Sequence, residues 1–319
     1  MDLLVRAEDL CARPLSDRSL RERLVRLVAE RVAFDGHVFA LTDPVSGVAS
    51  SPHATVPMLP WERLPAVIGQ RYLAGSDEEW RGLLAPYGVT DTALVRFTDR
   101  HGGWGWLELW RTGGAFTEAD RSLLERLAPT VTTGLRAAAA RTFVADAGAL
   151  AGLGPGVVVL GPDLGVRAQT DAAASALLRL LPPDEPMPPI PAAAYNAGAA
   201  LLAVEAGRWP GEPAARVHLG GNRWVTVRAA RLGDTVAGDI AVSIAPSTAG
   251  GRTDLFARVH GLSPRETEVL GLAVHGLDSR QVADLLVIAR TTAEDHLKAL
   301  LAKSRSPTRQ VLVARALGA

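Results

Sequence analysis

The sequence predicts a multidomain protein of the α+β class, in which two α/β domains precede an all-α domain of four helices. Three observations support this prediction. The chain has 319 residues, which is enough for two or three domains. Strand-like alternation and helix-like periodicity both occur in two separate stretches before residue 246. Residues 256–319, in contrast, show only short amphipathic helical patterns.

The composition indicates a soluble, cytoplasmic protein. Apolar residues make up 48% of the chain, and 34 basic residues balance 34 acidic ones. A neutral chain has no global attraction to nucleic acid or to a membrane, so any such attraction must be local. The single cysteine, Cys11, excludes an internal disulfide and fits a reducing compartment. The start of the chain does not have a signal-peptide pattern, and no apolar stretch is long enough to span a membrane.

Residues 1–145 are expected to form the first domain. Leucines at helical spacing come first, short alternating segments follow around turns, and a long amphipathic segment closes the domain. The predicted elements are a helix ending near Phe34, the strands His37–Leu41, Thr92–Thr98 and Gly105–Arg111, and a helix from Phe116 to Ala140.

Residues 150–246 are expected to form the second domain. The proline-rich run from Pro182 to Pro191 predicts a stiff connector, and Gly220-Gly221-Asn222 predicts a hairpin turn. The predicted elements are the strands Val157–Leu160 and Val166–Gln169, the helices Asp171–Leu181 and Ala192–Val204, and the strands Arg216–Leu219, Trp224–Ala229 and Asp239–Ile244.

A flexible linker at 247–255 is expected to lead into a C-terminal domain at 256–319. Ser263 to Glu266 has the pattern of a capping box with proline at the first helical position, and Asp278 to Gln281 caps a second helix. A third helix follows after a very short turn, and a fourth begins at Ser306-Pro307. Two helices joined so tightly predict a helix-turn-helix, whose second helix enters the DNA major groove.

This C-terminal segment resembles the LuxR-type DNA-binding domain. The resemblance implies a four-helix fold and binding of double-stranded DNA. Fifteen positions follow the family pattern in one register: Leu262, Arg265, Glu266, Val269, Leu270, Gly276, Gln281, Val282, Ala283, Leu286, Ile288, Thr292, His296, Leu300 and Lys303.

The two preceding domains resemble sensor domains. Residues 92–137 combine strands, glycine turns and the segment FTEADRSLLERLAP, and are similar to the second half of a GAF domain. Residues 154–246 have the element order of a PAS domain. These resemblances imply that a small-molecule effector or a partner protein controls the C-terminal domain.

The resemblance also implies which residues contact DNA. We expect Lys298 near the bases and Arg290 and Lys303 at phosphates. The full set of expected DNA-binding residues is Ser279, Arg280, Arg290, Thr291, Thr292, Glu294, Asp295, Lys298, Lys303 and Arg309.

The recognition helix departs from the family pattern. Ala289 stands where serine usually caps this helix, so Thr291 to Glu294 is expected to act as a substitute capping box that starts the helix two residues later. Glu294 and Asp295 occupy groove-facing positions, where carboxylates repel phosphate unless they accept from cytosine or cap the helix. From Leu262 onward, eight Lys and Arg stand against six Asp and Glu. We therefore expect weak binding by a monomer and tighter binding by a homodimer, with the helix Phe116–Ala140 as a candidate seam.

Trp104, Trp106 and Trp110 alternate along one strand and could stack on a flat ligand, although the favoured alternative is that they pack the core. The histidines have no metal-ligand spacing, so we expect no metal and no cofactor. We also find no nucleophile paired with a base and no phosphate-binding glycine loop, and expect no enzyme activity and no catalytic residue. The acidic pair of a phosphorylated receiver domain is missing as well.

The sequence as a whole predicts a sequence-specific transcription regulator that acts as a dimer on double-stranded DNA, without membrane association. One alternative remains open. A regulator with this altered recognition helix could bind protein and not DNA.

Overall fold

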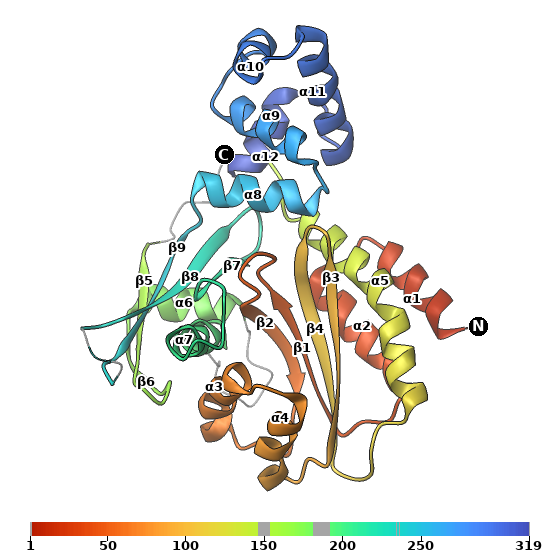
Figure 1. Cartoon of the computed structure of the whole chain (residues 1–319), viewed down its shortest axis with the longest axis vertical. Helices are drawn as coiled ribbons and strands as arrows, with labels where there is room; N and C mark the ends of the chain where they lie inside the picture. Colours follow the sequence, from red (N-terminus) through yellow and green to blue (C-terminus); the bar gives the residue numbers. More distant parts are fainter. Residues whose placement is uncertain (1, 146–153, 181–191, 234, 236, 319) are drawn as a thin grey trace. The chain divides into compact units, whose positions relative to one another are not determined.

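The computed structural model of the chain describes residues 2–145, 154–180, 192–233, 235 and 237–318. Figure 1 labels the helices and strands. In chain order they are α1 (Leu3–Ala12), α2 (Asp17–Ala29), β1 (Gly36–Thr42), β2 (Ala49–Thr55), the 3₁₀ turn η1 (Trp61–Arg63), α3 (Leu64–Leu73), α4 (Asp77–Leu84), the 3₁₀ turn η2 (Ala85–Tyr87), β3 (Asp91–Asp99), β4 (Gly102–Arg111), α5 (Glu118–Ala140), β5 (Gly156–Leu160), β6 (Val166–Gln169), α6 (Asp171–Leu180), α7 (Ala192–Glu205), β7 (Ala214–His218), β8 (Trp224–Arg231), β9 (Ile240–Pro246), α8 (Ala249–Val259), α9 (Pro264–Val274), α10 (Ser279–Leu286), α11 (Arg290–Ser304) and α12 (Arg309–Leu317).

The chain forms two compact units. The first comprises Met1–Leu135, Leu153–Val217 and Val225–Ala245. The second comprises Arg136–Gly152, His218–Trp224 and Pro246–Ala319. Both predicted N-terminal domains, 1–145 and 150–246, therefore contribute most of their residues to the same unit. The predicted proline-rich connector, 182–191, lies outside the described residues.

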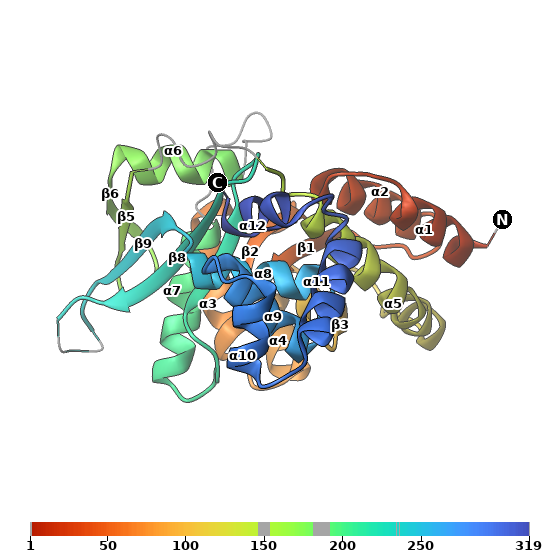
Figure 2. The ribbon, with the colours of Figure 1, turned by 90° about the horizontal axis from the view of Figure 1, so that it is seen from above.

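A four-stranded antiparallel sheet organises the first half of the first unit, in the order β2-β1-β4-β3. Helices α1, α2 and α5 lie side by side on one face of this sheet (Figures 1 and 2). They approach closely because α5 has glycine at position 134, where a Cβ would come within 2.8 Å of Cys11 Sγ. Burial there raises the pKa of the Cys11 thiol to about 11, so this cysteine is a packing residue without thiolate character at neutral pH.

The opposite face of the sheet is covered by α3 and α4. Their apolar side chains meet Trp110 of β4 in a core that includes Val67, Trp80 and Leu84. Both helices begin with recognisable signals, since α3 has proline in its first turn and α4 is capped by Ser76, whose hydroxyl accepts from Glu79 N.

A five-stranded antiparallel sheet, in the order β6-β5-β9-β8-β7, forms the second half of the first unit. Helix α7 packs in this half, and Gly198 brings it close to Leu160 and Leu164. Because 11 of its 14 residues are buried, α7 has apolar contacts on every side. It also packs against α3 and β2, and thereby joins the two halves into one unit.

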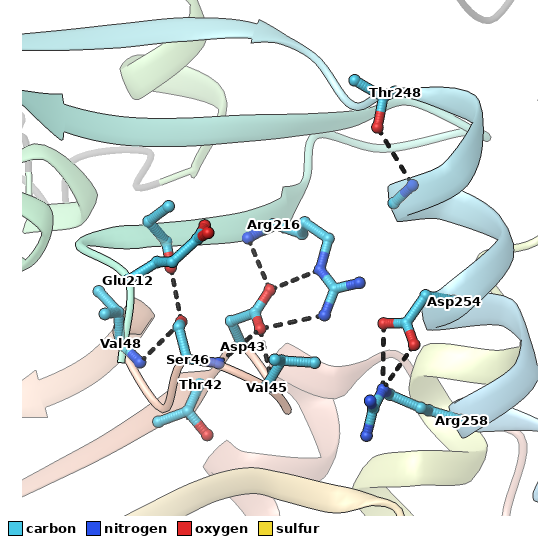
Figure 3. Close-up of polar contacts among 12 residues, drawn as sticks. Thr42, Asp43, Val45, Ser46, Val48, Glu212, Arg216, Thr248, Asp254 and Arg258 are labelled. Carbon is cyan, nitrogen blue, oxygen red and sulfur yellow. Dashed lines mark hydrogen bonds and ion pairs between the residues drawn. The ribbon is translucent and has the colours of Figure 1, made fainter. Parts of the chain in front are cut away.

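A buried ion pair ties the β1–β2 turn to the edge strand β7 (Figure 3). Arg216 donates from Nε to Asp43 Oδ2 at 2.6 Å and from Nη2 to Asp43 Oδ1 at 3.1 Å. Asp43 also accepts from the backbone nitrogens of Val45, Ser46 and Arg216. Burial alone would raise the pKa of Asp43, but the hydrogen bonds and charge of Arg216 hold it below its ordinary value.

The second unit contains α8 to α12 together with two segments from earlier in the chain. The predicted flexible linker at 247–255 is wrong, because residues 249–259 form helix α8. Thr248 caps this helix by accepting from Gly251 N at 3.1 Å (Figure 3), and Leu255 and Phe256 are buried. The local composition, rich in glycine and threonine, favoured a linker. The segment forms a helix because its apolar side chains are buried against the rest of the second unit. Among the described residues, no helix is both long and apolar enough to cross a bilayer.

Candidate nucleic-acid interface

Helices α9, α10 and α11 pack around a small apolar core. The predicted capping boxes are confirmed for α9, where Ser263 and Glu266 bond reciprocally, and for α10, where Asp278 and Gln281 do the same. Buried side chains from all three helices meet in this core: Val269, Leu270, Val282, Ala283, Ala293 and Leu300. The arrangement fixes α11 against α10 and leaves its opposite face in solvent.

The turn between α10 and α11 contains a strained residue. Val287 has a φ of 52° and a ψ of 52°, in the left-handed region that β-branched residues avoid. Its side chain is 89% exposed, so packing does not compensate for this conformation. The tight turn requires it, because Ile288 N closes back on the carbonyl of Ala283 at 3.0 Å.

Replacing Val287 by glycine should stabilise the second unit. Glycine adopts the left-handed region freely, and its own entropic cost offsets part of the gain, which leaves about 0.5–1 kcal/mol. Hydrogen exchange of the slowest amides of α9–α11 would measure the change. The control is Val5→Gly in α1, where replacing an exposed helical valine should instead lower stability by about 0.3–0.5 kcal/mol. Unchanged or faster exchange in Val287→Gly would contradict the strain argument.

The start of α11 differs from the prediction. The expected substitute capping box from Thr291 to Glu294 is wrong, because α11 begins at Arg290 with Ala289 as an N-cap that makes no side-chain hydrogen bond. Glu294 Oε1 instead accepts from Arg290 Nε at 2.8 Å, one turn away. The backbone follows the family position of the helix start even without the serine, since the turn after α10 already fixes it.

Three of the predicted DNA-binding residues share the outward face of α11. Thr291, Asp295 and Lys298 recur at i, i+4 and i+7, on the side opposite to buried Ala293 and Leu300. Lys298 Nζ lies 3.3 Å from Asp295 Oδ1, and both side chains are more than 70% exposed. Such exposed pairs contribute only about 0–1 kcal/mol, so Lys298 can turn to another anion at little cost. Thr292 is exposed beside this face.

Two of the predicted DNA-binding residues, Lys303 and Arg309, make hydrogen bonds within the fold. Lys303 Nζ donates to the buried carboxylate of Glu266 at 2.6 Å and so joins α11 to the start of α9. Burial alone would raise the pKa of Glu266, but the hydrogen bonds from Lys303 and Ser263 lower it. Arg309 donates to the carbonyl of Leu277. Because moving Lys303 to phosphate would leave a buried carboxylate without its cation, its first role here is structural.

The remaining predicted residues of this set lie at the start of α10. Arg280 is exposed, and Ser279 is half-buried at the first helical position. With Arg290 at the start of α11, Arg280 is one of the exposed cations of the helix-turn-helix.

The predicted tryptophan row lies in β4 of the first unit, where Trp110 belongs to the core beneath α3 and α4 and Trp104 falls at an irregularity of the β3–β4 pairing. Trp110 and Trp104 are buried, and Trp106 is half-buried. Trp104 Nε1 donates to Asp99 at 3.1 Å, and Trp110 Nε1 donates to Glu108 at 3.0 Å. Two of the three indoles thus belong to the core and use their N–H groups internally.

Glu108 gathers a polar cluster that sequence reasoning missed in part. Its carboxylate also accepts from Trp80 Nε1 at 3.1 Å and lies 3.3 Å from Arg71, whose guanidinium stacks on Trp80. Burial raises the pKa of Glu108, in opposition to the charge of Arg71. Besides Trp110, the partners of Glu108 come from α3 and α4, two helices that the sequence analysis did not predict.

Two histidines of the first unit lie next to each other. His37 and His53 pair across β1 and β2 with ring centroids 5.2 Å apart, and burial lowers the pKa of His37 to about 4. Within the described ranges, no group of three or more histidine, cysteine and acidic side chains is placed to hold a metal ion.

Two helices joined by a tight turn, with a polar exposed second helix, define a helix-turn-helix domain. Residues 260–316 match the family model described as bacterial regulatory proteins of the luxR family (GerE). The matched residues cover α9 to α12, so this part of the chain is a LuxR-family helix-turn-helix domain. A search of curated proteins found no match to the chain.

Proposed function

We propose that this protein is a transcription regulator that binds double-stranded DNA through α11. The observation that carries the proposal is that the LuxR-family match at residues 260–316 includes α11, which presents Thr291, Asp295 and Lys298 on an uncovered face within its unit. Arg280 and Arg290 are exposed beside them and are suited to phosphate contacts.

The charges of the recognition helix explain why we also propose a homodimer. Arg290 pairs with Glu294 and Lys298 with Asp295, so two of the exposed cations are partly neutralised. Lys303 and Arg309 are engaged within the domain. One copy therefore offers few phosphate contacts, whereas two copies on adjacent half-sites double them. Within α5, the candidate seam, Leu124, Leu127 and Leu135 are buried in the protomer, so a dimer seam along this helix would use its exposed residues.

Lys298→Ala and Arg290→Ala should separate base contacts from phosphate contacts. Lys298→Ala should weaken binding to the preferred DNA sequence by about 1–3 kcal/mol and relax the base preference at one position. Arg290→Ala should weaken binding to all DNA sequences by the same amount, because a phosphate contact carries no sequence information. Selection from a random duplex pool, followed by titration of the selected and scrambled duplexes, measures both effects. Equal losses on both duplexes for Lys298→Ala would contradict a base contact.

The second candidate is a regulator that binds protein through the same helix. The self-paired charges on α11 and the exposed apolar Leu285 and Val287 beside it favour this alternative. Salt dependence distinguishes the two, because phosphate contacts release counterions and give a steep fall of affinity with salt. A shallow slope, or no duplex binding at low salt, would favour the protein-binding alternative.

We further propose that the first unit is a sensor that responds to a small molecule or a partner protein. The GAF-like and PAS-like resemblances support this, and each sheet is antiparallel with helices packed on it, as an α+β sensor fold requires. Thermal shift of the full chain against a library of flat aromatic metabolites tests it, since a ligand that binds the folded state raises the melting temperature.

A further inference from the structure

The second unit includes α8, which precedes the LuxR-family span, and two segments from earlier in the chain. One is the end of α5 and the residues after it, and the other is the turn His218–Trp224 between β7 and β8. Phe143 from the first segment is fully buried and stacks on Trp224 from the second, with ring centroids 5.5 Å apart. The same ring meets Phe256 of α8 edge-on at 5.4 Å. Helix α8 is thus packed on pieces of chain that the sequence places in the two preceding domains.

Arg252 of α8 lies beside this aromatic cluster with only 1% of its surface exposed. Its Nη1 donates to the carbonyl of Asn222 at 3.0 Å, and its Nη2 donates to Asn222 Oδ1 at 2.7 Å and to the carbonyl of Arg315 at 3.4 Å. The guanidinium carbon is 5.6 Å from the centre of the Phe143 ring. All of these acceptors are neutral, and no carboxylate in the described residues pairs with Arg252. A buried cation held only by neutral oxygens is weakly stabilised.

The cluster also contains buried donors that lack a partner. In the described structure, Arg252 Nε, Asn222 Nδ2 and Trp224 Nε1 make no hydrogen bond. Each unpaired donor favours exposure to water, whereas the aromatic stack favours the closed contact. Because these two contributions oppose each other, neither the closed nor the open form of this contact is strongly preferred. Both forms are then accessible.

Arg315 of α12 connects the aromatic cluster around Phe143 to the recognition helix α11. Its Nε donates to the carbonyl of Phe143 at 2.5 Å. Its Nη1 donates to the carbonyl of Ser304, the last residue of α11, at 2.6 Å, and to Ser306 Oγ at 3.1 Å. A displacement of Phe143 therefore removes one of the bonds that orient Arg315, which in turn holds the C-terminal turn of α11.

We propose that Arg252 and Asn222 form a latch that couples the segments at 136–145 and 218–224 to DNA binding by α11. The inference rests on the proposed function. In the closed latch, Arg315 holds the end of α11, while no latch residue covers Thr291, Asp295 or Lys298. The closed latch is thus the state that binds DNA, and opening it loosens α11 and lowers affinity.

The test compares three variants of the full chain. Asn222→Ala removes the side-chain acceptor and opens the latch, whereas Asn222→Asp replaces an unpaired donor with an oxygen and gives Arg252 an anion. Asn196→Ala is the matched control, because Asn196 is also buried but lies in α7 of the first unit, where its Nδ2 donates to Ala192 O at 2.7 Å. Peptide-resolved hydrogen exchange of α8 and α12 and affinity for a pool of random-sequence duplex DNA at low salt are the two measurements.

We expect exchange in α8 and α12 to speed up at least about tenfold in Asn222→Ala and to slow in Asn222→Asp, because hydrogen bonds to a charged group are the stronger ones. DNA affinity should fall in the first variant and rise in the second. Asn196→Ala should leave both measurements on the second unit unchanged. Exchange that does not respond to either Asn222 variant overturns the latch. Exchange that responds while DNA affinity stays constant overturns its role in DNA binding. If the unsubstituted protein binds no duplex DNA, the proposed function fails, and the exchange data still decide whether the latch exists.

Discussion

Asp43→Asn should lower the free energy of unfolding of the first unit by about 3–5 kcal/mol, because it leaves the buried guanidinium of Arg216 without its anion. The two side chains of this pair are only 4% and 11% exposed. Because the amide replaces one of the two oxygens by a donor, either Val45 N and Ser46 N or Arg216 N and Nε also lose their acceptor. Exchange of the slowest amides of β1 and β7 measures the loss.

The matched control is Asp239→Asn. Asp239 accepts from Arg167 at 2.7 Å in the same unit, but the Arg167 side chain is 57% exposed. Exposed pairs contribute about 0–1 kcal/mol, so this variant should change stability little. Equal effects of the two substitutions would show that burial does not determine the strength of the Asp43 pair.

Acid should weaken the first unit through the same pair. Because the folded-state pKa of Asp43 lies below its ordinary value, the stability that it contributes is complete above the ordinary carboxyl pKa. The contribution is lost as the pH falls from there through the lowered pKa. Asp43→Asn removes the titrating group, so the variant should have a flatter dependence of stability on acid pH than the unsubstituted protein.

Leu300→Ala should destabilise the second unit by about 2–5 kcal/mol, because it opens a cavity where α9, α10 and α11 meet. Leu300 is fully buried, whereas Leu297, which also follows the helical spacing, is only half-buried. The larger loss therefore belongs to Leu300, and Leu297→Ala serves as its control. Exchange of the slowest amides of α9 measures both. A larger loss in Leu297→Ala would contradict the placement of the core at Leu300.

The sequence predicted best those helices and strands whose own residues show the periodicity and the capping signals. The strands at 91–99 and 102–111 and the helices α2, α5 and α9 to α12 follow periodicity and capping, which act within a few residues. The stretch from β2 to α4 received no assignment. Strand β2 has Pro52 and polar neighbours, which the sheet accepts because β2 is an edge strand. Helix α3 depends on packing against α7, more than a hundred residues later.

The sequence predicted which residues belong to the candidate interface. It did not predict which of them are free to contact DNA and which are engaged within the fold. The family pattern placed Lys298 and Lys303 on the same helix. Their roles differ because Lys303 pairs with Glu266, which lies 37 residues earlier in the chain. A pairing at that separation leaves no local trace in the sequence. The same holds for Arg252, whose acceptors lie 30 residues before it and 63 residues after it. Long-range side-chain contacts of this kind are fixed by the fold, and helix periodicity alone does not reveal them.

The composition of the second unit limits how modular this protein can be. A chimera joined at residue 246, with a foreign sensor ahead of it, would keep all of α8 to α12 but would lack Phe143, Asn222 and Trp224. Arg252 and Phe256 would then lose their buried neighbours. Exchange of sensors between such proteins therefore requires a junction that carries these contacts along, or a compensating change at Arg252. The two parts of the chain must in this respect evolve together, although they occupy separate stretches of the gene.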